Sequence, residues 1–131
     1  MYEVRIDPLE FFYKSGNGQL FASITCKVAV YNVQTVPTPP PQNITTSHNA
    51  SGGLDISVIL AVTGEETSGS TEKVCAFYVL LESLSTGLDE NEVREAIGRK
   101  VYNVSVTTYY DGSPKKTGTG TLSNSSEIEI E

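Results

Sequence analysis

The chain contains few of the residues on which most catalytic and metal sites depend. Its 131 residues include no tryptophan, one histidine, His48, and two cysteines, Cys26 and Cys75. A zinc site needs several Cys or His ligands at close spacing, and no such set occurs. A lone histidine in a polar segment is typical of a solvated side chain. We therefore expect a protein that is not an enzyme and that holds no metal and no cofactor.

Positive charge and long apolar runs are also scarce. The 9 Lys and Arg residues are outnumbered by 16 Asp and Glu residues, which gives a net charge of −7. An acidic surface repels the phosphates of nucleic acids and of anionic membranes, so we expect neither as a partner. The apolar run Val74–Leu81 has the length of a strand. It falls well short of the ~20 residues that cross a bilayer.

The dominant pattern is an alternation of apolar and polar residues with a period of two. It extends over Leu20–Val30 and again over Leu54–Val62. This pattern is typical of strands with one buried and one solvated face. The hydrophobic fraction of 38% suits a two-layer sandwich with polar outer faces. The sequence therefore predicts an all-β protein, an antiparallel β-sandwich, as a single domain over residues 1–131.

Further strands and one helix complete the prediction. The strand Glu3–Ile6 is interrupted at Asp7-Pro8 and resumes at Leu9, because proline lacks an N–H donor. The nearly continuous apolar run Val74–Leu81 predicts a central strand covered on both faces. The pattern leaves open whether Phe77 and Val79 or Tyr78 and Leu80 face the core. The remaining predicted strands are Val101–Tyr110, Lys116–Leu122, in which Gly118 and Gly120 weaken the strand or mark bulges, and the edge strand Glu127–Glu131.

The one predicted helix spans residues 89–97. Asp89 is a suitable N-cap, and Glu92 follows three residues later, as in a capping box. Val93, Ala96 and Ile97 form an apolar stripe that predicts packing on one end of the sandwich.

A proline-rich segment, Gln34–Gly53, is predicted to be a long loop. Its proline run favours extended polyproline II, which aromatic grooves bind in other proteins. The alternative is a solvated connection. The candidate contact residues of this loop are Pro37, Pro39, Pro40, Pro41, Ile44 and His48. The terminal strands Met1–Ile6 and Glu127–Glu131 are the other expected contact surfaces.

Two sets of residues could carry covalent modifications. Cys26 and Cys75 each fall in a predicted strand, so a disulfide across the core is compatible with the pattern. The alternative is a pair of buried thiols, which pack as small hydrophobic groups. Four Asn-x-Ser/Thr sequences would accept glycans in a secreted eukaryotic protein. They begin at Asn43, Asn49, Asn103 and Asn124.

The start of the chain carries the pattern of a known family. In Val4–Phe12 a short strand is followed by a proline and a Leu-x-Phe segment, and Gly16–Gln19 form a glycine-rich turn before the long alternating strand. This order resembles the start of BACON-type and related immunoglobulin-like modules, which occur in surface proteins of Bacteroidota and in their phages. The resemblance covers the N-terminal quarter, and the family's tryptophan after the second strand is absent. It implies an all-β, immunoglobulin-like antiparallel β-sandwich and transfers no functional residue.

Two functions fit these observations. The first is a structural protein of a phage virion, as a capsid decoration or head–tail component that contacts other virion proteins or copies of itself. The second is a secreted or cell-surface recognition or adhesion domain, with glycans on Asn43 or Asn49. Residues Met1–Arg5 lack the apolar segment of a secretory signal. This favours a chain made whole in a cytoplasm or an excised ectodomain.

Overall fold

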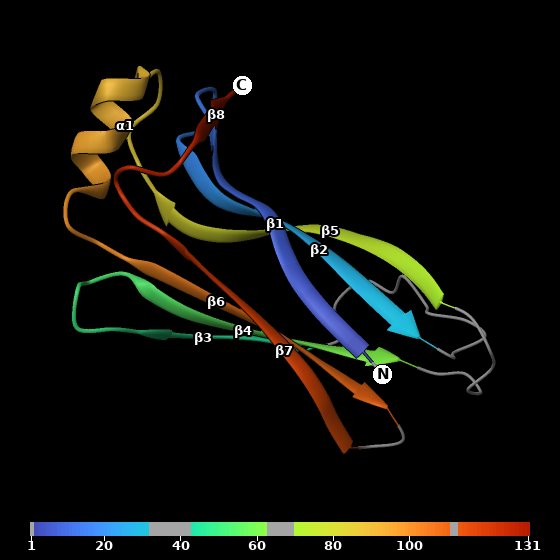
Figure 1. The fold of residues 1–131 in the computed structure, drawn as a ribbon. Coiled ribbons are helices and arrows are strands. Elements are labelled where there is room, and N and C mark those ends of the chain that lie inside the picture. Colours follow the sequence, from blue (N-terminus) through green and yellow to red (C-terminus); the bar gives the residue numbers. More distant parts are fainter. Residues whose placement is uncertain (1, 32–42, 63–69, 111–112) are drawn as a thin grey trace.

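The computed structural model shows two four-stranded sheets packed as a sandwich, with one short helix at one end (Figure 1). It describes residues 2–31, 43–62, 70–110 and 113–131. The elements are β1 (Tyr2–Lys14), β2 (Gln19–Tyr31), β3 (Asn43–His48), β4 (Leu54–Val62), β5 (Ser70–Ser83), α1 (Glu90–Ile97), β6 (Tyr102–Tyr110), β7 (Ser113–Leu122) and β8 (Ile128–Ile130). The predicted β-sandwich with a short helix is confirmed.

The strand order is β5-β2-β1-β8 in the first sheet and β3-β4-β6-β7 in the second. Four of the pairings are antiparallel, as predicted: β1–β2, β2–β5, β3–β4 and β6–β7. The pairs β1–β8 and β4–β6 are parallel, so each sheet is mixed. Each parallel pair joins strands that are far apart in the sequence.

The core consists of the inward-facing residues that the period of two predicts. In β2 every second residue from Leu20 to Cys26 is buried, and in β6 the same holds from Tyr102 to Val106. Fully burying one large apolar side chain stabilises the fold by roughly 1.5–3 kcal/mol. The alternation is therefore the main sequence signal for the fold. Other core residues are Phe11, Tyr13, Ile56, Val58, Leu60, Val79 and Leu122.

The two sheets approach closely where β1 packs on β7. A Cβ atom at Gly118 would lie 2.7 Å from the carbonyl oxygen of Val4, and one at Gly120 would lie 2.7 Å from Cδ2 of Leu9. The β6–β7 register continues through both glycines, and its one shift lies between Thr108 and Tyr109. The predicted bulges at these glycines are therefore wrong. Both positions lack a side chain, and this leaves room for β1 to approach β7.

The helix closes one end of the sandwich. The Asp89 carboxylate accepts a hydrogen bond from Glu92 N at 2.8 Å, and the Glu92 side chain accepts one from Asp89 N at 3.1 Å, which confirms the capping box. Val93 and Ile97 are buried against the core. The buried Tyr13 hydroxyl accepts a hydrogen bond from Leu88 N at 3.1 Å, which ties β1 to the segment before the helix.

Two predicted elements need correction. The strand β5 is an edge strand and not a central one, and its residues Tyr78 and Leu80 are 60% and 47% exposed. Phe77 and Val79 face the core instead. The predicted loop 34–53 contains β3, because residues 43–48 pair in continuous register with β4. The four prolines at positions 37, 39, 40 and 41 lie outside the described residues.

We expect Gly118→Ala to lower the free energy of unfolding by about 1–3 kcal/mol, the usual effect of overpacking. The new methyl group would meet backbone atoms of Val4, which cannot rotate away. The measurement is the midpoint of urea unfolding. Gly16→Ala is the matched control, since a Cβ there has no atom within 4 Å. Equal midpoints for the two variants would contradict the proposed close approach.

Candidate functional site

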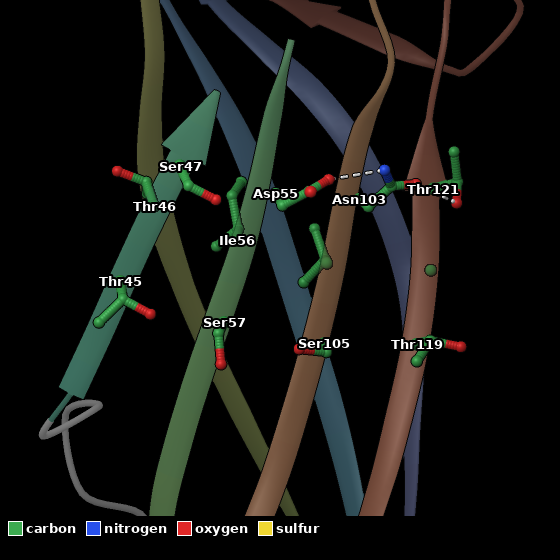
Figure 2. Close-up of a pocket in the computed structure, with 12 residues that line it drawn as sticks. Thr45, Thr46, Ser47, Asp55, Ile56, Ser57, Asn103, Ser105, Thr119 and Thr121 are labelled. Carbon is green, nitrogen blue, oxygen red and sulfur yellow. Dashed lines mark hydrogen bonds between the residues drawn. The ribbon is translucent and has the colours of Figure 1, made fainter. Parts of the chain in front are cut away.

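The outer face of the second sheet carries rows of small polar side chains. The register aligns Ser47, Asp55, Asn103 and Thr121 in one row across the four strands. A second row consists of Thr45, Ser57, Ser105 and Thr119. These residues line an open groove of about 550 Å³ (Figure 2), which we call the hydroxyl face.

Asp55 is the one carboxylate that lines this groove. It accepts hydrogen bonds from Asn103 Nδ2 at 2.8 Å and from Asn49 Nδ2 at 3.2 Å. These bonds stabilise the ionised form and hold the pKa of Asp55 below its usual value of 3.8. Thr121 donates to the Asn103 side-chain oxygen at 3.2 Å, which extends the network to β7. The hydroxyl face is thus an ordered surface of hydrogen-bonding groups around one fixed negative charge.

Three of the four candidate glycosylation asparagines use their side-chain amides inside the fold. Asn49 donates to the carbonyl of Val101 at 2.8 Å and so fixes the turn between β3 and β4 beside the start of β6. Asn103 donates to Asp55, and Asn124 donates to the carbonyl of Arg94 at 2.6 Å. Because Asn49 Nδ2 also donates to Asp55, both of its protons are used, and a glycan there would replace a hydrogen-bonded proton. Asn43 is exposed at the first residue of β3.

The strand β3 is an edge strand whose side chains are all exposed. It contains two of the predicted contact residues, Ile44, which is 41% exposed, and His48. Natural sheets protect their edges with charges, prolines, bulges or short strands. The other three edges follow this rule: β5 contains Glu82 and a register shift, β7 contains Pro114 and two lysines, and β8 has three residues including Glu129. The β3 sequence, NITTSH, has no Asp, Glu, Lys, Arg or proline.

The terminal strand β8, by contrast, is joined to its own chain. Phe11 N donates to the carbonyl of Glu127 at 2.9 Å, and Glu131 N donates to the carbonyl of Tyr13 at 3.0 Å. Ile128 packs against the core. These bonds satisfy one edge of β8 within the sandwich.

The two cysteines lie opposite each other on neighbouring strands of the same sheet, β2 and β5. A bridge between them would join adjacent strands and would not span the two sheets as predicted. Cys26 is buried in the core, and the side chain of Cys75 lies outside the described residues. The structure therefore changes what such a bridge could link and does not test whether it forms.

The outer face of the first sheet carries an aromatic cluster that the sequence analysis missed. The ring centroids of Phe12 and Tyr78 are 5.4 Å apart, and those of Phe21 and Tyr78 are 6.2 Å apart. Lys14 Nζ lies 5.9 Å from the Phe21 centroid. Together with Glu131, these residues line a hollow of about 230 Å³, which we call the aromatic hollow. One feature of the sequence could have indicated this cluster: Phe21 is an aromatic residue at a solvent-facing position of the alternating strand Leu20–Val30.

A half-buried charged group joins β5 to the start of β6. Lys100 Nζ lies 2.7 and 2.9 Å from the two carboxylate oxygens of Glu82, and the Tyr102 hydroxyl donates to the same carboxylate at 3.3 Å. Burial, and then the charge of Glu82, raise the pKa of Tyr102 to about 12. Because each group is paired with another, this cluster has the features of a structural link.

Among the described residues no three His, Cys, Asp or Glu side chains lie close enough to hold a metal ion. In the same part of the chain, no helix has the length and apolar character needed to cross a membrane. No protein-family model, curated protein or solved structure matches this chain. The interpretation of its surfaces therefore rests on their own chemistry.

We expect Asn103→Ala to raise the pKa of Asp55 toward 3.8, because it removes the first of the hydrogen bonds that lower this pKa. The stability that Asp55 contributes is present above its unfolded-state pKa and is lost as the pH falls through the lower folded-state value. NMR titration of the Asp55 carboxyl carbon measures the shift. Thr119→Ala, a change on the same face without a hydrogen bond to Asp55, is the control. An unchanged pKa in Asn103→Ala would contradict this account of the network.

Proposed function

We propose that this protein is a non-enzymatic structural protein of a phage virion, either a capsid decoration or a head–tail component. It acts through contacts with other virion proteins or with copies of itself. The observation that carries the proposal is the uncharged edge of β3, which lacks the protective features of the other three edges. The virion location follows from the resemblance of the N-terminal segment to modules found in phages.

An edge strand of this kind can accept another strand in the plane of its sheet. The added strand satisfies the backbone N–H and C=O groups along the edge, and its side chains cover those of the edge strand. In β3, Ile44 is the exposed apolar residue that such a strand would cover. Two copies related by a two-fold axis at Thr46 would pair in antiparallel fashion and place Ile44 of one copy opposite the partner's His48. This arrangement keeps the hydroxyl faces of both copies on the same side of the joined sheet.

A secreted or cell-surface recognition domain is the second candidate function. The groove on the hydroxyl face, with Asp55 held by two asparagines, favours it because such a surface can bind a polar ligand. This candidate predicts glycans on Asn43 or Asn49 and a Cys26–Cys75 disulfide, and Asn43 is the acceptor whose position at the exposed start of β3 suits a glycan. Intact mass before and after deglycosylation and reduction separates the two functions.

We expect the double variant Ile44→Lys, Thr46→Lys to weaken self-association by at least about tenfold, which corresponds to ~1.4 kcal/mol. Lysines on β3 would place like charges opposite each other across the new strand pair and would protect the edge. Sedimentation equilibrium at micromolar concentration measures the average mass, which should fall. The matched control is Thr117→Lys, Thr119→Lys on the other edge of the sheet. A wild-type chain that stays monomeric, or equal masses for wild type and the β3 variant, would refute the proposed role of β3.

A further inference from the structure

The aromatic hollow is unusual because it faces away from the core. Phe12 is only 8% exposed although its side chain lies on the outer face, since the Phe21 and Tyr78 rings contact it. Tyr78 itself is 60% exposed. Exposed aromatic clusters of this kind on a protein surface are typical of sites that bind another molecule. The ring planes are tilted by 50–75° to one another, so the rings surround a depression and do not form a flat plate.

The polar groups at the hollow select against a charged ligand. Lys14 and Glu131 contribute one positive and one negative charge. A phosphate site would need several cations, and a cation site would need several carboxylates. With aromatic walls, and with Lys14 and the Tyr78 hydroxyl as hydrogen-bond donors, the hollow suits an uncharged apolar segment that offers backbone carbonyls. A proline-rich segment in an extended conformation has this chemistry, and aromatic-lined grooves bind such segments.

The chain contains such a segment in its own sequence. Residues 34–42 read QTVPTPPPQ, which includes a Pro-x-x-Pro spacing from Pro37 to Pro40 and no charged residue. In a protein with a net charge of −7, contacts between copies are opposed by charge repulsion. A contact made by an uncharged segment on a hollow whose two charged side chains, Lys14 and Glu131, have opposite signs avoids adding to this repulsion.

Reach opposes docking within one molecule. Phe21 lies ten residues before Tyr31, the end of β2, which is a distance of about 33 Å along an extended strand. Tyr78 pairs with Ser23, which lies eight residues, or about 26 Å, before Tyr31, whereas Pro37 reaches at most ~21 Å from Tyr31. Residues 39, 40 and 41 lie four, three and two positions before Asn43, the first residue of β3 in the other sheet, so they stay within ~14, ~11 and ~7 Å of it. Figure 1 shows the same separation: β2 runs from the end that carries β8 and α1 toward the opposite end, where it stops.

We propose that the aromatic hollow of one copy binds the proline-rich segment 36–41 of a second copy. The two copies then contribute different parts of the chain, so the contact is heterologous and joins copies head to tail. Such a contact forms a ring when the rotation closes and a filament when it does not. This contact uses neither β3 nor its edge and stands independently of the proposed β3 pairing.

The decisive test mixes two variants, both in the Ile44→Lys, Thr46→Lys background, which removes the β3 contact. One variant carries Tyr78→Ala and keeps its proline segment. The other, the serine variant, carries Pro37→Ser, Pro39→Ser, Pro40→Ser and Pro41→Ser and keeps its hollow. Sedimentation velocity should show that the parent background forms chains or rings, that each variant alone is monomeric, and that the equimolar mixture forms a heterodimer and nothing larger. A mixture that stays monomeric, or a serine variant that assembles like the parent, overturns the proposal.

A second measurement locates the contact. A synthetic peptide of residues 34–42 is titrated into the isotope-labelled background protein, and we expect NMR shifts at the amides of Phe12, Phe21 and Tyr78. Tyr78→Ala should weaken peptide binding at least about tenfold. Leu80→Ala is the matched control, since Leu80 is an exposed neighbour that does not line the hollow. No shifts at millimolar peptide, shifts elsewhere on the protein, or equal binding of a peptide with serine in place of proline would overturn the assignment.

Discussion

The packing of β1 on β7 is the constraint on which the arrangement of the surfaces depends. Gly118 and Gly120 let β7 approach β1 more closely than any side chain would allow. This contact brings the two sheets together on one side of the sandwich. On the side away from it, each sheet ends in a strand without a further partner among the described residues, β5 in one sheet and β3 in the other. The exposed edge is that of β3, and the exposed aromatic side chain of Tyr78 lies on β5.

The sequence predicted the inward faces of the strands well because their signal is local. The alternation in β2, β4 and β6 identifies the buried residues without knowledge of any neighbour, and the capping box around Asp89 needs only three residues. The position of a strand within its sheet is not a local property. The apolar run in β5 was therefore interpreted as a central strand, although its outward residues Tyr78 and Leu80 cover the outer face of an edge strand. The two parallel pairings could not be predicted for the same reason.

The candidate surfaces were predictable only in part. Ile44 and His48 stood out as apolar and titratable residues in a polar segment, and both lie on β3. Their strand was missed because six residues between prolines and glycines resemble a loop. The aromatic hollow draws its residues from β1, β2, β5 and the end of the chain, and only the register brings them together. No spacing within a single strand contains this information, since Phe12 and Tyr78 are separated by about half of the chain.

The two proposed contacts differ in symmetry, and this difference determines what they can build together. Pairing of β3 with itself is isologous and stops at two copies, because it uses the same edge on both. Docking of a proline segment into the aromatic hollow is heterologous and repeats from copy to copy. A protein that has both can extend in one direction through the hollow and join neighbouring rows through β3. Neither contact needs a buried charge, which suits a chain whose −7 net charge opposes close packing of many copies. A surface with this charge opposes assembly through its acidic regions and favours the two proposed contacts, which carry little net charge.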